Sequence, residues 1–468
     1  MRRLRSGPLR QHPAPLDPRR HPRGHPFSAR ILTREDHLAL EATFHCWAIA
    51  DILRPHVARL VVSNPLQTKA IAQAKIKTDK VDAKVLAHLL RCDYLPEVWQ
   101  PDERTRTMRT VCGRRAGLIS ERTRLKNRIR GVLNARLIPA PDTDLFEAKG
   151  LRWLQELQID PQGRALIDSD LRLLELLERE IEGVDDALAA DAWEDPRVRL
   201  LMTIPGVDFP TAQTILAALG DIARFQDGDH AASYLGLVPS TSQSGDHCYH
   251  GPITKHGNPK ARWMMVQAAQ HLATHPGPVG VFFRRVAKRK NRNVAVVATA
   301  RKLLVIAWLM LTAGEPYRYA QPEATQAKLA RLRVRVTGKR RAGGTAKGRP
   351  RSPRYGTGQG VRSVPSLPQV YRREGLPAAA LESLPAGERQ TLAHTKTIAF
   401  ARRVERPAQR SRTSTTAGSP TRLSGRACVM EAPRDRTNGQ VPCNPAPAEP
   451  EPTVDARAKN ATNPCAGA

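Results

Sequence analysis

The chain has 468 residues and carries 75 Lys and Arg against 44 Asp and Glu, a formal net charge of +31. Its seven cysteines are scattered without a Cys-x-x-Cys pair, which argues against a disulfide framework and a zinc site. The apolar run Leu303–Leu311 is too short to cross a bilayer, and the first residues lack the apolar core of a signal peptide. We expect a cytoplasmic protein of two or three domains, with no membrane segment, whose partner is a polyanion such as nucleic acid.

The positive charge is concentrated at the two ends of the chain. Residues 1–30 hold eight basic residues and one acidic residue, and residues 331–468 hold 26 and nine. The Arg/Pro/His-rich residues 1–30 show no periodicity, so we expect a disordered or unrelated basic leader. We likewise expect residues 321–468 to be a basic, mostly disordered tail, with one short helix near Leu376–Leu384.

Residues 31–102 show the pattern of an α/β domain. "DHLALEAT" is an apolar run that ends at Glu41 and predicts a strand, and "FHCWAIADILRPH" has helical spacing up to Pro55. A second strand is predicted in "VARLVVSNP" and a helix over Thr78–Arg91. This order of strand, helix, strand and helix predicts parallel strands joined by a right-handed crossover.

Three carboxylates are expected to converge in this domain. Asp79 and Asp82 are three residues apart at the start of a helix and therefore share one face, and Glu41 ends the first strand. Strand ends and helix starts meet at one edge of a parallel sheet, where ligands bind. Carboxylates that converge there suit Mg²⁺, which also binds phosphate oxygens. An Asp-x-x-Asp pair is weak evidence alone, because a capping Asp beside a solvated Asp explains such a pair more often than a metal site does.

Residues 103–195 predict a helical arm. Residues 103–136 form a basic helix with a narrow apolar stripe that includes Leu118, Leu125 and Ile129, and residues 168–190 form a leucine-rich acidic helix. These two helices could pair with each other in antiparallel fashion or form an intermolecular coiled coil. The arm is therefore a candidate for oligomerisation or for nucleic-acid binding.

Residues 196–320 predict an all-α domain. "LLMTIPGVDFPTAQTILAALGDIARF" resembles a helix-hairpin-helix, in which backbone N–H groups approach a phosphate, although Asp208 replaces its second glycine. An ordinary helical core element explains the pattern equally well. Apolar helices are expected over Arg262–Thr274 and Val294–Thr312. Between these segments lies a loop rich in Ser and Gly at 240–245, in which an activated serine could attack phosphorus. Possible donors or bases nearby are His247, His250, Lys255 and His256.

Several segments together resemble one known family, the IS110-type transposases. "LEAT…W" at 40–47, "NP…KAIAQAKIKTDKVDAKVLAHLL" at 64–90 and "RTRLKNRI" at 122–129 are similar to its N-terminal half. "IPGVDFPTAQTILAALGDIARF", "YLGLVPSTSQSG" and "ITKHGNPKAR" are similar to its C-terminal half. The resemblance covers roughly 31–335 in the family's order.

The resemblance implies an α/β RNase H-like (RuvC-like) domain over 31–102, a helical arm over 103–195 and a transposase C-terminal domain over 196–320. It implies an Asp-Glu-Asp-Asp site for Mg²⁺ (or Mn²⁺) in which Glu41, Asp79 and Asp82 match the last three members. The family's serine matches Ser244 best, with Ser242 as the alternative. Implied partners are the DNA of the element ends and target, a structured guide RNA and further copies of the chain as a dimer or tetramer. The basic residues that we expect to contact nucleic acid are Lys77, Arg124, Lys126, Arg128, Lys255, Lys260 and Arg262.

One family feature has no counterpart in this chain. The family opens with an apolar strand that carries the first aspartate. In this chain Asp17 lies in "PLDPRRHPR", and this segment cannot form a central strand because of its prolines. We therefore expect a sheet without its first strands and a metal site without one carboxylate.

Three functions follow from these patterns. The first is Mg²⁺-dependent DNA strand exchange with a serine nucleophile, associated with the bacterial nucleoid. The second is a catalytically inactive nucleic-acid-binding remnant, which the missing aspartate favours. The third is a RuvC-like junction nuclease, in which the carboxylates act without the serine.

Overall fold

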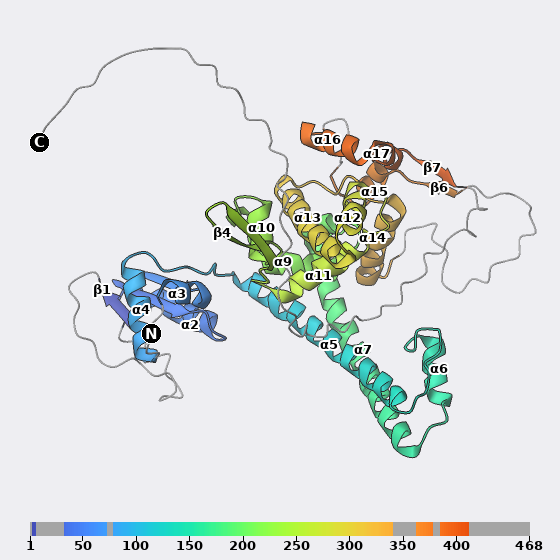
Figure 1. Ribbon diagram of the computed structural model, residues 1–468, viewed down its shortest axis with the longest axis horizontal. Helices are drawn as coiled ribbons and strands as arrows, with labels where there is room; N and C mark the ends of the chain where they lie inside the picture. Colours follow the sequence, from blue (N-terminus) through green and yellow to red (C-terminus); the bar gives the residue numbers. More distant parts are fainter. Residues whose placement is uncertain (1, 6–31, 73–77, 340–361, 378–383, 411–468) are drawn as a thin grey trace, which may run out of the picture. The chain divides into compact units, whose positions relative to one another are not determined.

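The computed structural model describes residues 2–5, 32–72, 78–339, 362–377 and 384–410, and Figure 1 labels their helices and strands. Predictions for residues 6–31, for Lys77 and for residues 411–468 lie outside this description, as does most of the helix expected near Leu376–Leu384.

The N-terminal region contains a three-stranded sheet in the order β1-β2-β3. As predicted, β2 (Asp36–Glu41) and β3 (Arg59–Ser63) are parallel, and α2 (Cys46–Leu53) with the short 3₁₀ helix η2 (Arg54–His56) connects them. The helices α3 (Pro65–Ile71) and α4 (Asp79–Arg91) follow.

The first strand corrects one prediction. Residues 1–30 were expected to lack structure, but Arg2–Arg5 form β1, which pairs antiparallel with the free edge of β2. A sheet edge presents unpaired N–H and C=O groups to any extended segment, so backbone pairing does not require an apolar strand sequence.

Alternation along β2 explains which helix covers which face. Leu38 and Leu40 pack in one cluster with residues of α2, whereas Ala39 packs on the other face with Val61 of β3 and Leu90 of α4. Successive side chains of a strand point to opposite faces. The sheet is therefore covered by α2 on one face and by α4 on the other.

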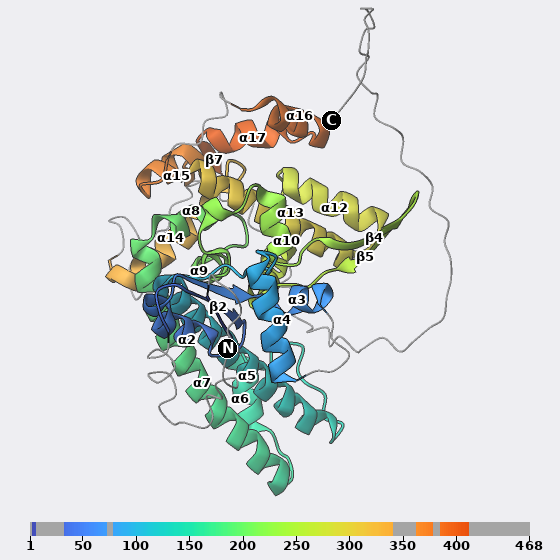
Figure 2. The ribbon, with the colours of Figure 1, turned by 90° about the vertical axis from the view of Figure 1, so that its left-hand side faces the viewer.

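Two long helices form the arm. α5 (Glu103–Asn134) and α7 (Pro161–Glu194) run side by side in both views, with α6 (Ala148–Glu156) between them in sequence (Figures 1 and 2). Ion pairs link Arg115 to Asp185, Arg122 to Glu178 and Arg128 to Asp170. The residue numbers of the partners on α7 decrease as those on α5 increase, so the two helices are antiparallel. This is the intramolecular pairing, one of the two arrangements that the sequence left open.

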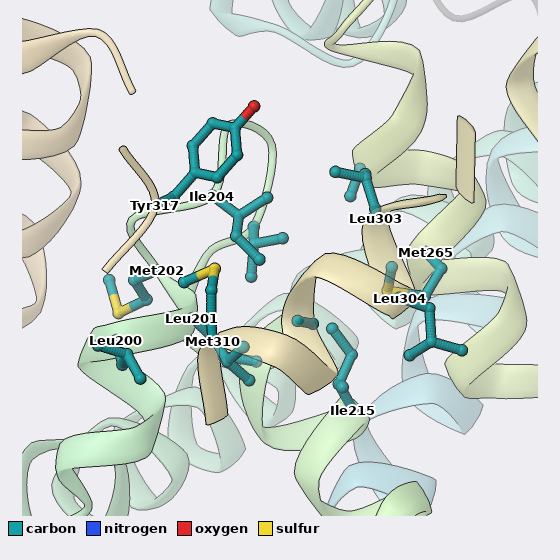
Figure 3. Packing of buried hydrophobic residues seen from close by; sticks show 14 of the residues in the cluster. Leu200, Leu201, Met202, Ile204, Ile215, Met265, Leu303, Leu304, Met310 and Tyr317 are labelled. Atoms are coloured by element: carbon teal, nitrogen blue, oxygen red, sulfur yellow. The ribbon is translucent and has the colours of Figure 1, made fainter. Parts of the chain in front are cut away.

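The helical domain is built around α9 (Phe209–Leu219), all of whose residues are buried, and α13 (Arg292–Ala313). Side chains from these helices pack with Leu201, Ile204 and Met265 in the core (Figure 3). The remaining elements up to residue 313 are α8 (Pro196–Leu201), η3 (Ile222–Arg224), α10 (Gly228–Tyr234), β4 (Pro239–Ser244), β5 (His247–Ile253), α11 (Pro259–Gln270) and α12 (Pro278–Arg289).

Among the described residues, α13 alone is long and apolar enough to pass a test for a membrane-spanning helix. Its most apolar stretch is 44% buried inside the protein, where Leu303, Leu304 and Ala307 belong to the hydrophobic core. A core helix passes the same test, so this observation adds no evidence for a membrane segment.

The Pro-Gly turn before α9 has a structural role. Ile204 and Val207 are fully buried. Asp208 caps α9, because its Oδ1 accepts a hydrogen bond from the backbone N–H of Phe209 at 2.9 Å. The buried ammonium of Lys328 donates to the carbonyl oxygens of Ile204 and Val207 at 2.7 and 2.9 Å. These contacts favour the ordinary core element over a phosphate-binding hairpin.

Beyond residue 320, where a mostly disordered tail was predicted, the described residues contain regular structure. They form α14 (Pro322–Thr337), β6 (Arg362–Val364), α15 (Leu367–Arg373), α16 (Ala386–Thr395), α17 (Ile398–Glu405) and β7 (Ala408–Arg410), while the prediction for residues 340–361, 378–383 and 411–468 lies outside the description. Leu329, Tyr371 and Phe400 belong to the same hydrophobic cluster as α9 and α13. These apolar patches are short, so they hardly change the average composition of the segment. They fold because they pack against the hydrophobic core of the preceding domain.

Candidate active site and nucleic-acid contacts

Glu41 is positioned by the alternation of β2. It follows Ala39 by two residues and therefore points to the face that α4 covers. On α4, Asp79 and Asp82 precede the buried Ala83 and Ala87 at helical spacing, so the carboxylates lie at the start of the face that packs on the sheet.

The three predicted carboxylates line one cleft. Glu41, Asp79 and Asp82 surround a cavity of about 180 Å³ whose other walls are Ala39, Leu40, Ala83, Leu86 and Ala87. Glu41 and Asp79 are exposed, and Asp82 is half-buried. The cleft therefore has an apolar floor and carboxylate groups at its rim.

The donors of this cleft suit a hard divalent cation, because carboxylate oxygens are the ligands that Mg²⁺ and Mn²⁺ accept. Their placement is less complete. Within the described ranges, no three His, Cys, Asp or Glu side chains lie close enough together to hold a metal ion. β1, the strand beside β2, carries the sequence Arg-Arg-Leu-Arg and so offers no further carboxylate. The carboxylate oxygens are therefore of the type that binds a divalent ion, whereas the described side chains do not form a complete set of metal ligands.

The serine-rich segment, expected as a loop, is instead a β-hairpin. β4 and β5 pair antiparallel with Ser244 opposite His247, and Gly245 and Asp246 form the two-residue turn. Gly245 has a φ of +57°, which glycine adopts without strain in such a turn. The residues of β4 are exposed throughout, so no apolar alternation marked this strand in the sequence.

The hairpin register separates the candidate bases. Directly opposite residues share a face, so Ser244 lies beside His247, and Ser242 lies beside Tyr249 on the same face. His250 lies on the other face, where its Nδ1 is 3.1 Å from Thr241 Oγ1. His247 is therefore the histidine nearest in register to Ser244. The Gly-Asp turn was the sequence signal that could have identified this pairing.

Four of the predicted nucleic-acid contacts have partners inside the protein. Arg128 pairs with Asp170 across the arm, and Lys126 lies over the Phe146 ring at 4.9 Å, where burial lowers the pKa of its ammonium. Further contacts of this kind join Lys260 Nζ to the Gly113 carbonyl at 3.1 Å and Arg262 to the carbonyls of Leu235 and His256 at 2.9 and 2.7 Å. These four cations therefore have a structural role within the protein, and their contact with nucleic acid stays a prediction.

The other three predicted contacts differ among themselves. Arg124 is exposed, and among the described residues its ion pair is with Glu121, one turn away on its own helix, at 2.5 Å. Lys255 is exposed, and its backbone has a φ of +56° after β5. A nucleic-acid contact therefore stays a prediction for Arg124 and Lys255, while Lys77 lies outside the described residues.

Comparison with known proteins identifies relatives over both halves of the chain. An IS110 DEDD model, described as "Transposase", matches residues 29–137, and a model described as "Transposase IS116/IS110/IS902 family" matches residues 198–280. The chain is 28% identical over 256 residues to the transposase for insertion sequence element IS1111A of Coxiella burnetii, which covers 52% of this chain and 68% of that protein.

Two further relatives extend the match. An insertion element IS116 protein of 44.8 kDa from Streptomyces clavuligerus is 27% identical over 299 residues, covering 53% of this chain and 74% of the relative. A pilin gene-inverting protein of Moraxella bovis is 28% identical over 294 residues, covering 60% and 81%. Both family models match in chain order, one over the carboxylate domain and one over the helical domain, so both parts of the chain are similar to transposases of the IS110 family.

Proposed function

We propose that this protein is a transposase that exchanges DNA strands, with Ser244 as the nucleophile and with Glu41, Asp79 and Asp82 as ligands of Mg²⁺ or Mn²⁺. The observation that carries the proposal is the shared cleft of the three carboxylates at the end of β2 and the start of α4. A divalent ion bound there would neutralise charge on phosphate oxygens, as in other RNase H-like sites.

The serine chemistry would proceed on the exposed hairpin. Ser244 Oγ attacks a DNA phosphorus atom, a Ser–O–P bond forms, and the bond from phosphorus to one sugar oxygen breaks. His247, opposite Ser244, is the proposed base. It takes the hydroxyl proton and delivers it to the departing sugar oxygen, so that the phosphodiester is conserved as a protein–DNA ester. Attack on this ester by the hydroxyl of another strand would release the serine and complete the exchange.

The proposed partners are the DNA of the element ends and target, a structured guide RNA and further copies of the chain. Three exposed leucines support self-association. Leu166, Leu173 and Leu176 lie on one side of α7 and are each between 44% and 49% exposed, although α7 already packs against α5. An uncovered apolar stripe on a long helix is typical of a helix–helix interface between subunits. We propose a dimer or tetramer assembled through the arm.

The inactive nucleic-acid-binding remnant is the second candidate. Two observations favour it: the described side chains do not form a complete set of metal ligands, and the sequence of β1 is basic. Such a protein would bind DNA without forming a covalent product.

The test is a search for a covalent protein–DNA product with Mg²⁺ and element-end DNA, using wild-type protein, Ser244→Ala and the matched control Ser242→Ala. We expect the product with wild type and Ser242→Ala. Ser244→Ala should lose it and keep DNA affinity, because the hydroxyl acts in chemistry and contributes little to binding.

Each alternative predicts a different result. Cleavage that survives Ser244→Ala and requires only the carboxylates would identify a junction nuclease. A wild-type protein that binds DNA and forms no product under any metal condition would identify the inactive remnant, and either result would overturn the proposal.

A further inference from the structure

Residues 247–314 contain 11 Lys and Arg and no Asp or Glu. This contrasts with the arm, where Arg115, Arg122 and Arg128 of α5 each pair with a carboxylate of α7. The chain therefore supplies carboxylates for the arginines that join the two arm helices. Over 247–314 no carboxylate lies within the segment; Arg301 is paired with Asp229 of α10 at 3.0 Å, and Lys260 and Arg262 donate to backbone carbonyls. Cations of the segment without such partners leave a positive potential at the surface.

Four of these cations form a fixed surface, which we call the basic turn: Lys288, Arg289, Lys290 and Arg292. All four are exposed at the end of α12 and the start of α13, and the structure records no ion pair for them with any described carboxylate. Asn291, between them, caps α13 by accepting a hydrogen bond from Val294 N at 2.8 Å. Because helices hold both sides of this turn, its backbone needs little further ordering on binding.

A cavity connects the helix after the basic turn to the serine hairpin. It measures about 740 Å³ and is lined by Asn293, Arg301 and Lys302 of α13, by Asp229 of α10 and by Pro239 and Gly251 at the base of the hairpin. Arg301 is paired with Asp229 at 3.0 Å, which leaves Lys302 as the lining cation for which the structure records no ion pair with a described carboxylate. Lys302 lies over the Phe282 ring at 5.0 Å, and burial followed by the charge of Arg285 lowers the pKa of its ammonium.

We propose that the basic turn, together with Lys302 in the lining of this cavity, binds the sugar–phosphate backbone of the DNA strand that is presented to the Ser244 hairpin. The inference rests on the proposed strand exchange for the identity of that strand. A run of charges is often only a solvated surface. Here the four cations lie at the junction between two helices, form no recorded ion pair with a described carboxylate, and directly precede Asn293, where α13 begins to line the cavity at the base of the hairpin. A polyanion complements such an arrangement.

The experiment compares full-length wild type with the triple variant Lys288→Gln, Arg289→Gln and Lys290→Gln. The matched control is Lys149→Gln, Arg172→Gln and Arg179→Gln, three exposed cations of the arm with the same loss of charge. Affinity for a DNA duplex is measured at several salt concentrations. We expect the basic-turn variant to bind roughly 10-fold or more weakly, with a log–log salt slope flatter by about 3, because each phosphate contact contributes about one unit. The control should remain near wild type.

A further variant, Lys288→Arg with Lys290→Arg, preserves the charge and should retain wild-type affinity and slope, which separates electrostatics from misfolding. Equal losses in the triple variant and its control would overturn the proposal, as would weakened binding of structured RNA with unchanged DNA affinity. Because this readout is binding, it is independent of whether Ser244 forms a covalent product. If the basic-turn variant loses DNA affinity and the wild type forms no covalent product, strand exchange is rejected and the DNA-binding surface stands. If the wild type forms the product and the basic-turn variant binds DNA normally, only the DNA-binding surface is rejected.

Discussion

Thr78 is the residue that caps α4, which leaves Asp79 and Asp82 available for another role. Its Oγ1 accepts a hydrogen bond from Val81 N at 3.2 Å. Capping by an aspartate was the main alternative explanation of the Asp-x-x-Asp pattern, and the structure assigns that task to the preceding threonine. Both carboxylates still lie in the first turn, where the helix dipole favours negative charge.

The metal proposal predicts a stability difference. Mg²⁺ or Mn²⁺ at 100 times its dissociation constant should stabilise the wild type by about 2.7 kcal/mol, because only the folded cleft binds it. Asp79→Asn with Asp82→Asn should abolish that gain, and thermal melts with and without metal measure it. Without metal, the change should stay within about 1 kcal/mol, since lost helix-dipole interactions oppose relieved repulsion.

Asp142→Asn with Glu156→Gln, two exposed acids of the arm, is the control and should keep the gain. A metal-free Asp79→Asn, Asp82→Asn protein that is strongly destabilised would mean that the pair is structural. A metal response that survives the substitutions would locate the ion elsewhere.

The convergence of the carboxylates could be predicted from the sequence, whereas the intramolecular partners of the basic residues could not. The approach of Glu41 to Asp79 and Asp82 follows from strand and helix periods alone, which are local properties. Whether an arginine is free depends on partners far along the chain, such as Asp170 for Arg128. The cations of the basic turn lie outside the motifs that resemble the family, so they did not stand out in the sequence. The signal that could have identified them is the absence of acidic residues over 247–314.

At the scale of elements, the strongly periodic segments were predicted and the polar ones were not. The parallel β2 and β3, and α4 and α5, follow from apolar spacing and clear end signals. The β4–β5 hairpin has no buried face, so its strands carry no alternation. Its register comes from the two-residue turn at Gly245 and Asp246.

The apolar stripe of α7 predicts an oligomer that depends on this helix. Replacing Leu166, Leu173 and Leu176 together by Gln should reduce the particle mass measured by light scattering to that of a monomer. The folded state should remain, because these side chains are about half exposed within one chain. The control is Leu309→Gln on α13, a leucine of similar exposure (53%), which should leave the mass unchanged. A triple variant of unchanged mass would exclude the arm as the interface.

For the molecule as a whole, the order of the regions was predicted and the extent of the helical domain was not. The tail prediction rested on average composition, which hid Tyr371 of α15. This side chain is fully buried, and its hydroxyl donates to the Tyr317 carbonyl at 2.5 Å. An apolar patch of a few residues shows no period of its own, and only the core that it meets decides whether it folds.

The integration of α15 into the core predicts graded losses of stability. Tyr371→Ala should lower the free energy of unfolding by about 3–5 kcal/mol, as for other large side chains removed from a core. Tyr371→Phe keeps the ring and should cost about 1–2 kcal/mol for the unpaired Tyr317 carbonyl. Urea unfolding measures both. An alanine variant as stable as the wild type would mean that α15 is dispensable to the domain.

The central claim is that a serine on the β4–β5 hairpin of this protein attacks DNA. Its most direct test is to incubate the full chain with element-end DNA and Mg²⁺, digest the product with protease and nuclease, and locate the attached nucleotide by mass spectrometry. The account predicts a nucleotide on Ser244, lost on removal of Mg²⁺ and in Ser244→Ala. A nucleotide on Ser242 or any other residue, or DNA exchange without any attached nucleotide, would contradict it.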